Sequence, residues 1–349
     1  MSKRSLREAV VVVTGASSGI GRATALAFAR RGARVVVAAR RREPLDSLIA
    51  ECERVSGMSA VAVPTDVSDE TQVSALAQRA VQRFGRIDVW INNAGVYAAG
   101  RFEDTPPQVF RQVIEVNFFG YVYGARAALP HLKRQHGVLI NNASVDSMAS
   151  FPYFSAYVAS KWAVRGFSAS LRQELVSDGV DVCTILPASI DTPLFQHAAN
   201  YMGRAMKALN PTYDPEQVAA AMLHCAENGG PREVIVGLAG RLLALQYTLA
   251  PGLSERIFRK QVELDHFSPS APAVASDGNV LAPMADGVGT TGGWKDSRGH
   301  RLPRGVIAGA AVAALPMAGL LVRRWRTLQR HTSAPGVLAP MVGRIRSFG

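Results

Sequence analysis

A short apolar strand that runs straight into a glycine-rich turn is the feature that most restricts the fold of this chain. Residues 10–13 are all valine, and Thr14-Gly15-Ala16-Ser17-Ser18-Gly19-Ile20-Gly21 follows, before an alanine-rich helix over about 22–31. Glycine permits the sharp turn and lets a ligand approach the backbone closely. The backbone amides at the start of the helix then favour an anion such as a pyrophosphate. We therefore expect a dinucleotide at the edge of a parallel sheet.

The remainder of the chain repeats this alternation of strand and helix. Apolar runs predict strands, and periodic stretches between them predict helices. Such alternation specifies right-handed crossovers, and hence a Rossmann-type doubly wound parallel α/β sheet of six or seven strands. The hydrophobic content of 48% is ample for its core. The predicted strands are 10–13, 34–39, 60–63, 87–91, 138–141, 180–186 and 233–236, and the later helices are 44–55, 69–84, 107–132, 157–177 and 218–227.

The length of 349 residues suits one such domain followed by an extension. We assign 1–265 to the nucleotide-binding catalytic domain, 266–303 to a Pro/Gly/Ser-rich linker or surface wrap, and 304–349 to an apolar helix and a basic tail. Within the last segment, residues 306–322 carry no charge. As a helix they would extend about 26 Å at ~1.5 Å per residue, slightly less than a ~30 Å hydrocarbon core. A membrane span, a shallow or re-entrant membrane contact, and a helix that packs within the protein or an oligomer remain alternatives.

Charge and cysteine content exclude other classes of protein. Of the net charge of +12, eight arginines of 301–349 supply +8 without any acid, which leaves +4 for the first 300 residues. The core therefore lacks the basic patch of a nucleic-acid-binding domain, and we predict no nucleic-acid partner. Three cysteines without a CxxC pair argue against a disulfide framework or a metal site. The first apolar run is too short for a secretory signal, so we expect a cytoplasmic catalytic domain.

The end of the second strand selects the cofactor. It reads Ala38-Ala39-Arg40-Arg41-Arg42, with no acid before Glu43. NAD sites place a carboxylate here, whereas arginine pairs with the 2′-phosphate of NADP. We predict NADP(H), with Arg40 as the main contact and Arg22 as a candidate second one; the alternative is a solvated basic loop. Asp66, after the third strand, could accept from the adenine amino group or cap the next helix.

A candidate catalytic group follows from the spacing of three residues. Tyr157 and Lys161 are four apart on a predicted helix and therefore share one face. An unperturbed tyrosine titrates near ~10, and a nearby ammonium would lower its pKa. Ser144 ends a predicted strand at the carboxyl edge, where ligands bind in open α/β sheets.

Together these motifs resemble the short-chain dehydrogenase/reductase family, classical type. The resemblance covers roughly residues 8–237. One departure is Pro187-Ala188, where the family usually has Pro-Gly. The matching elements, in order, are the glycine-rich turn, Asp66, Asn92-Asn93-Ala94-Gly95, Asn117, Ser144, Tyr157-Val-Ala-Ser-Lys161 and the segment 187–192.

The resemblance implies a role for each matching residue. Tyr157 would be the general acid or base, Lys161 would hold the nicotinamide ribose and tune Tyr157, Ser144 would stabilise the substrate oxygen, and Asn117 would hold a relay water. Asn92 and Gly95 would shape the cofactor pocket. The predicted cofactor contacts are Gly15, Ser17, Ser18, Gly19, Ile20, Gly21, Arg40, Asp66, Val67, Asn93, Ala94, Gly95, Tyr157, Lys161, Pro187, Ile190 and Thr192. Family members commonly form homodimers or homotetramers through the helices here predicted at 107–132 and 157–177.

The segment between Thr192 and Asp214 would cover the substrate. It is rich in apolar side chains, including Phe195 and Met206, which favours a lipophilic carbonyl or secondary alcohol. These side chains could equally pack a lid or an oligomer interface. His197 fits a lid residue better than a metal ligand. The predicted activity is NADP(H)-dependent interconversion of a carbonyl and an alcohol; the alternative is a non-catalytic NADP(H)-binding regulator or scaffold.

Overall fold

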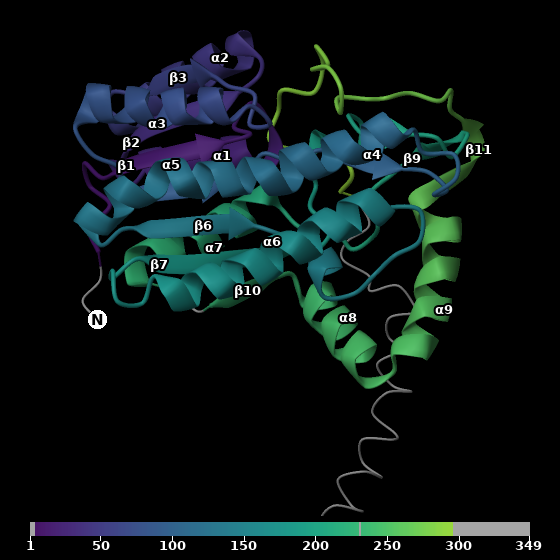
Figure 1. The fold of residues 1–349 in the computed structure, drawn as a ribbon. Coiled ribbons are helices and arrows are strands. Elements are labelled where there is room, and N and C mark those ends of the chain that lie inside the picture. Colours follow the sequence, from purple (N-terminus) through teal and green to yellow (C-terminus); the bar gives the residue numbers. More distant parts are fainter. Residues whose placement is uncertain (1–3, 230–231, 296–349) are drawn as a thin grey trace, which may run out of the picture.

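A parallel sheet of seven strands forms the centre of the molecule (Figure 1). The computed structural model describes residues 4–229 and 232–295; the apolar segment 306–322 and the basic tail lie outside them. The strand order β10-β7-β6-β4-β1-β2-β3 confirms the predicted doubly wound fold. The strands are β1 (Val10–Thr14), β2 (Arg34–Ala39), β3 (Val61–Pro64), β4 (Val89–Asn92), β6 (Val138–Asn142), β7 (Asp181–Pro187) and β10 (Glu233–Val236).

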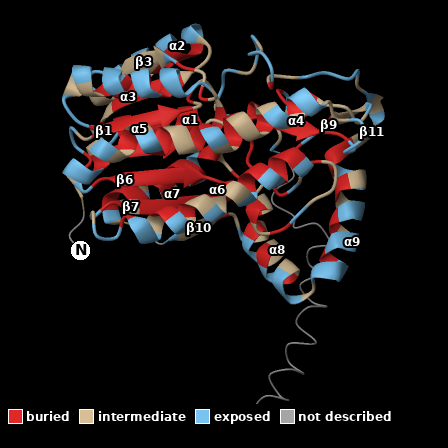
Figure 2. Ribbon diagram, viewed as in Figure 1, coloured by how far each residue is buried: buried red, intermediate tan, exposed pale blue. Residues whose placement is uncertain are grey.

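Helices cover both faces of the sheet, which explains why its strands are apolar throughout. Along β1, Val11 and Val13 join the core beneath one helical layer, and Val10 and Val12 join the core beneath the other. Figure 2 shows the buried sheet between helices whose outer faces are exposed. The first layer is α1 (Gly19–Ala29), α2 (Arg42–Ser56) and α7 (Pro215–Asn228); the second is α3 (Glu70–Phe84), α4 (Pro107–Ile114), α5 (Gly120–Gln135) and α6 (Ser155–Glu174).

The predicted helix 107–132 is present as an unbroken helical run, but it is not α-helical throughout. A π-helical turn, η1 (Glu115–Phe119), separates α4 from α5. At its centre, the buried Asn117 side chain accepts from Val96 N at 2.8 Å and donates to Val96 O at 3.0 Å. These long-range bonds tie the turn to the chain after β4. Helical periodicity cannot reveal a partner so distant in sequence.

Beyond Gly237 the chain forms elements that approach the carboxyl edge of the sheet (Figure 1). Helices α8 (Leu238–Leu249) and α9 (Pro251–Gln261) are followed by the π-helical turn η4 (Val262–His266) and by β11 (Phe267–Pro272). Strand β11 pairs antiparallel with β9 (Arg204–Met206). A second small pair joins β5 (Ala98–Ala99) to β8 (Ala199–Asn200). The segment 238–272 therefore extends the predicted α/β domain at the carboxyl edge of the sheet, where a ligand would bind.

Residues 276–295, here called the strap, return across the domain. Its backbone meets the segment 197–200 through Asn200 N to Ser276 O at 2.8 Å and Asn279 N to His197 O at 2.7 Å. Near its end, Trp294 Nε1 donates to Thr192 O at 2.8 Å. The strap thus passes over the carboxyl edge of the sheet.

Two further observations concern only residues 4–229 and 232–295. No helix there is both long and apolar enough to cross a membrane. Within the same ranges, no cluster of three or more His, Cys, Asp or Glu side chains could hold a metal ion. Cys52, Cys183 and Cys225 are buried free thiols.

Candidate active site

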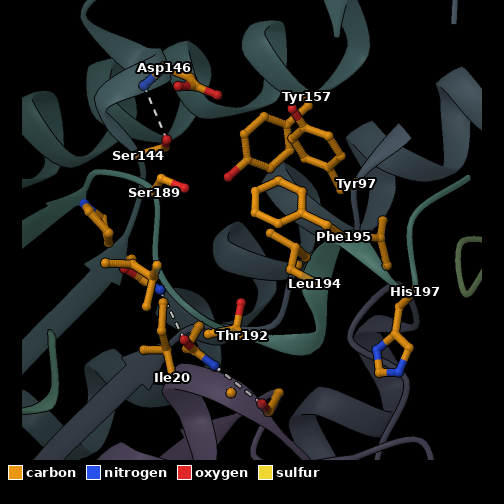
Figure 3. A pocket seen from close by; sticks show the side chains of 18 of the residues that line it. Ile20, Tyr97, Ser144, Asp146, Tyr157, Ser189, Thr192, Leu194, Phe195 and His197 are labelled. Carbon is orange, nitrogen blue, oxygen red and sulfur yellow. Dashed lines mark hydrogen bonds between the residues drawn. The ribbon is translucent and has the colours of Figure 1, made fainter. Parts of the chain in front are cut away.

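A cavity of about 300 Å³ opens at the carboxyl ends of the central strands. The strand order reverses between β1 and β4, and α/β sheets bind ligands at such a switch point. Figure 3 shows Ile20 and Thr192 toward one end of this space and the rings of Tyr97 and Tyr157 toward the other. The cavity therefore joins the predicted nucleotide site to the predicted catalytic group.

The glycine-rich turn leads from β1 into the start of α1. Gly15 and Gly19 have φ of +65° and +54°, which side chains rarely adopt. A Cβ at Gly21 would overlap the Gly15 carbonyl, so only glycine fits there. Ser18 makes no side-chain cap to α1. All predicted members of the turn line the cavity: Gly15, Ser17, Ser18, Gly19, Ile20 and Gly21.

The arginines after β2 differ in their surroundings. Arg40 lines the cavity, and its Nη2 donates to Asn279 O of the strap at 2.6 Å; burial lowers its pKa. Arg41 also lines the cavity and donates to Ala285 O of the strap. Arg42 instead turns to the surface, where its Nε donates to Asp46 at 2.9 Å.

The expectation that Arg22 could be a second phosphate contact is wrong. Arg22 is buried, pairs with Glu51 and donates to Pro44 O at 3.2 Å, and so ties α1 to α2. It does not line the cavity. Its place on the first helical turn gave no sign that its side chain would point to α2.

Asp66 lines the cavity beside Val67 and does not cap the next helix. The N-cap of α3 is Asp69, which accepts from Thr71 N and Gln72 N. Asp66 accepts from Ser68 N at 3.0 Å. The structure therefore excludes the helix-capping role for Asp66, and the contact to the adenine amino group stays a prediction.

The segment after β4 packs against the glycine-rich turn. Asn93 Nδ2 donates to Thr14 O at 2.9 Å, and Asn93, Ala94 and Gly95 line the cavity. Asn92 lies beneath them: its Nδ2 donates to Asn141 Oδ1 at 2.9 Å, and it does not line the cavity. Its effect on the pocket is therefore indirect, through the packing of strand β4 on β6.

Ser144, Tyr157 and Lys161 all line the cavity, as their spacing predicted. Ser144 follows β6, and its Oγ accepts from Asp146 N at 3.1 Å (Figure 3). Lys161 Nζ lies 5.5 Å from the centroid of the Tyr157 ring and donates to Asn142 O at 2.8 Å. Helix α6 presents Tyr157 and Lys161 on one buried face.

The electrostatics of this group differ from the sequence-based expectation. Burial, followed by the nearby Asp146, raises the pKa of Tyr157, while the Ser144 hydroxyl partly opposes the shift. Burial lowers the pKa of Lys161 to about 7, against the effect of Asp146. Burial likewise raises the pKa of Asp146 to about 7, against the effect of Lys161. Desolvation is therefore the main influence on the Tyr157 pKa, and the lowering expected from the Lys161 ammonium is not seen.

Asn117 lies next to this group without lining the cavity. A Cβ at Gly95 would lie 3.4 Å from Asn117 Oδ1 and 3.9 Å from Lys161 Nζ, which places Asn117 near the lysine. Its side-chain amide is already engaged by Val96 and by Ser160 Oγ at 3.1 Å. The relay role of Asn117 stays a prediction.

The segment after β7 forms the wall opposite the glycine-rich turn. Pro187, Ile190 and Thr192 line the cavity, and a Cβ at Gly19 would lie 3.1 Å from the Thr192 side chain. The methyl of Ala188, the departure from the family pattern, packs toward α8: a Cβ at Gly240 would lie 3.2 Å from it. The alanine that stands where the family usually has glycine therefore lies next to Gly240 of helix α8.

The far end of the cavity is largely apolar. Tyr97 lies with its ring centroid 4.6 Å from that of Tyr157 and 5.5 Å from that of Phe195. Phe195 belongs to the apolar segment predicted to cover the substrate, whereas no sequence motif marks Tyr97 or the contributions from beyond Gly237. The other side chains that line this end include Phe151, Leu194, Leu209, Leu243, Gln246, Phe258, Gln261 and His266.

His197 is held by the strap. Its Nε2 lies 2.9 Å from Asp286 O. This contact agrees with the expected covering role and gives the imidazole a partner other than a metal.

The comparisons with known proteins agree with this geometry. A sequence model described as short chain dehydrogenase matches residues 9–202. The chain is 34% identical over 323 residues to the uncharacterized oxidoreductase YxnA of Bacillus subtilis, covering 89% of this chain and 90% of that protein. It is 34% identical over 273 residues to dehydrogenase/reductase SDR family member 7B of Bos taurus, covering 75% and 84%.

Solved structures give the same result. An alcohol dehydrogenase of the archaeon Thermococcus sibiricus, complexed with 5-hydroxy-NADP, aligns with a TM-score of 0.58 and 28% identity over 65% of this chain and 95% of that one. A short-chain dehydrogenase from Streptomyces avermitilis aligns with a TM-score of 0.59 and 33% identity, covering 67% and 89%.

The fold is of the Rossmann type, and together with the family match it defines a nucleotide-binding oxidoreductase. This chain belongs to the short-chain dehydrogenase/reductase family. The match to the Bacillus subtilis protein covers 89% of the chain, which is more than residues 1–265 alone could supply. The similarity to that protein therefore continues into the C-terminal part of the chain.

Proposed function

We propose that this protein is an NADP(H)-dependent oxidoreductase that interconverts a lipophilic carbonyl compound and the corresponding secondary alcohol. The observation that carries the proposal is one continuous cavity. It is bordered by the open glycine-rich turn, by Ser144, Tyr157 and Lys161, and by an apolar far end.

The residues present fit a dinucleotide. The turn before α1 has no room for a Cβ at Gly21 and leaves helix amides at the cavity. Buried polar atoms that line the cavity also lack partners within the described chain, namely Asn142 Oδ1, Ser189 Oγ and Asn279 Oδ1. Such orphaned groups are what a polar cofactor would satisfy.

The roles of the chain's own residues follow from their positions. The bound nicotinamide supplies or accepts the hydride. Tyr157, kept neutral by burial, is suited to give its proton to the oxygen of a carbonyl as it is reduced. Ser144 can donate a hydrogen bond to that oxygen and stabilise its developing charge. Lys161, whose Nζ donates to Asn142 O, would hold the ribose of the cofactor beside Tyr157.

Arg40 supports the choice of NADP(H) over NAD(H). It lies at the cavity after β2, where a 2′-phosphate would be read, and a guanidinium forms charge-assisted bonds to phosphate. Among the lining residues, the acid closest in sequence to Arg40 is Asp66. Asp66 follows β3, so it does not occupy the position after β2 where NAD sites place a carboxylate.

The alternative is a non-catalytic NADP(H)-binding regulator. One observation favours it: Gly19 N donates to Gly289 O at 2.9 Å, so the strap engages an amide of the glycine-rich turn. Against it stands the catalytic group at the same cavity, which a sensor does not need.

Turnover separates the two functions. The purified chain would be given NADPH or NADH with a panel of aliphatic and aromatic ketones, and loss of nicotinamide absorbance would be followed. Reduction of any ketone supports the enzyme, whereas tight NADPH binding without turnover across the panel supports the regulator.

A homodimer or homotetramer through α5 and α6 is also proposed. Phe119, the last residue of η1 before α5, and Trp162 on α6 are 38% and 42% exposed, so both are accessible to a second copy of the chain. Light scattering after gel filtration would give the mass. Membrane contact through 306–322 stays a prediction, because that segment lies outside the described residues.

A further inference from the structure

Two buried polar side chains line the apolar end of the cavity without hydrogen-bond partners. Gln246 on α8 is 5% exposed and His266 at the end of η4 is 1% exposed. Among the described residues, nothing bonds to Gln246 Nε2 or to either ring nitrogen of His266. Both come from the chain beyond Gly237, outside the motifs that define the catalytic group.

Aromatic rings fix the position of His266. Its ring centroid lies 5.1 Å from that of Phe154 and 5.2 Å from that of Phe195, both in edge-on contact. Tyr97 bridges the imidazole to the catalytic tyrosine, with centroid distances of 6.3 Å to His266 and 4.6 Å to Tyr157. Only the ring of Tyr97 therefore separates the imidazole from Tyr157, where the reacting carbonyl of the substrate would bind.

The protonation state of His266 follows from its burial. Burial lowers its pKa to about 3; the backbone of Lys207 opposes this shift in part, and the positive charge of Lys207 adds to it. At neutral pH the imidazole is uncharged and offers one N–H donor and one nitrogen acceptor. The amide of Gln246 adds a further donor.

Orphaned polar groups at a cavity select among ligands. A buried donor that stays unpaired costs its full desolvation free energy, whereas a ligand that pairs with it recovers that cost. Sites built to bond a ligand hydroxyl therefore reject an analogue that lacks it. A wholly hydrocarbon tail would cover Gln246 and His266 and leave them unpaired.

Charge limits the kind of polar group that this end can accept. Of the described lining residues, the cationic ones are Arg40 and Arg41 at the nucleotide end and Lys161 at the catalytic group. A carboxylate or phosphate beside His266 would have no cation among the lining residues of its own end, because Lys207, whose charge acts on His266, does not line the cavity. A neutral group that both donates and accepts, such as a hydroxyl, fits best.

We propose that Gln246 and His266 form a specificity subsite, and that the substrate is a mainly apolar ketone or secondary alcohol carrying a second, uncharged hydroxyl group remote from the reacting carbon. This inference rests on the proposed oxidoreductase function and names the class of substrate that the site takes.

The test on the wild-type protein uses ketones of equal carbon skeleton. The probes are 2-decanone, 10-hydroxydecan-2-one and 9-oxodecanoic acid, with their eight- and twelve-carbon counterparts, each reduced with NADPH. We expect the hydroxyketone to have a kcat/KM about three- to tenfold above the plain ketone at one or more lengths, the range that one or two neutral hydrogen bonds give. The keto acid should be the poorest probe.

Two variants locate the effect. Gln246→Leu and His266→Phe keep the size of the side chains and remove their hydrogen bonds, so each should reduce the preference for the hydroxyketone to below about twofold. Gln217→Leu, the same exchange at an exposed position of α7, is the matched control and should keep the full preference.

Binding provides a readout independent of turnover. Calorimetry on the NADP⁺-loaded wild type would compare decane-1,9-diol with 2-decanol, and the diol should bind about three- to tenfold more tightly. Failure to reduce any ketone, with this preference intact, would overturn the proposed function and retain the subsite. Equal treatment of hydroxylated and plain probes at every length, in both assays, would overturn the subsite alone, as would a preference that survives in both variants.

Discussion

Reversal of the charge at position 40 is the perturbation that most directly tests the cofactor assignment. Arg40 lies at the cavity beyond β2, and its Nη2 already donates to Asn279 O at 2.6 Å. The guanidinium has five N–H donors, so others remain for a phosphate. In Arg40→Asp the new carboxylate would repel a 2′-phosphate and could accept from the ribose hydroxyls of NADH.

The magnitude follows from the bonds that are exchanged. A charge-assisted hydrogen bond contributes about 1.5–3 kcal/mol, which is roughly ten- to a hundredfold in affinity. Arg40 also donates to Asn279 O of the strap, so only part of its guanidinium is available to the phosphate. We therefore expect that loss of the Arg40–phosphate contact alone lowers NADPH affinity by about tenfold, the lower end of this range. Repulsion by the aspartate adds to it. The ratio of the NADH to the NADPH dissociation constant should therefore fall at least about tenfold.

The assay is calorimetric titration of both cofactors at fixed ionic strength, because phosphate contacts weaken with salt. Arg42→Asp is the matched control: Arg42 pairs with Asp46 at the surface, so its reversal should alter the ratio by less than about twofold. Equal affinity of the wild type for NADH and NADPH, or an unchanged ratio in Arg40→Asp, would refute the reasoning.

Three other predictions concern the catalytic group. Tyr157→Phe keeps the ring contact with Tyr97 and removes the proton donor, so turnover should be abolished while titrated NADPH affinity stays within about threefold; wild-type-like turnover would contradict the assignment. Ser144→Ala should lower kcat by ~10²-fold or more in steady-state assays, by analogy with the loss of an oxyanion-hole donor. The pKa of Asp146 is raised to about 7 in the fold from 3.8, so the folded state binds more protons than the unfolded state between these values and stability falls as pH rises from about 4 to 7. Urea titrations should show a weaker fall in Asp146→Asn, and an identical slope in both proteins would count against the burial argument.

Local patterns in the sequence were sufficient for the architecture of the sheet. Parallel strands covered on both faces appear as continuous apolar runs, and the predicted strand 34–39 coincides with β2. The glycine-rich turn was equally visible, since only glycine fits at Gly21. The spacing of Tyr157 and Lys161 placed both on one face of α6, because helix geometry alone fixes that relation.

Other properties depended on contacts between distant parts of the chain, and only the tertiary structure decided them. Asn117 lies in a π-helical turn within the predicted helix and bonds to Val96, and Arg22 turns from the nucleotide site to Glu51 on α2. The pKa of Tyr157 rises because of burial, which spacing does not show, and the nearby Asp146 adds to the shift. His266 reaches the cavity more than one hundred residues after Tyr157, and no local pattern distinguishes a histidine that will line a site from one that will face solvent.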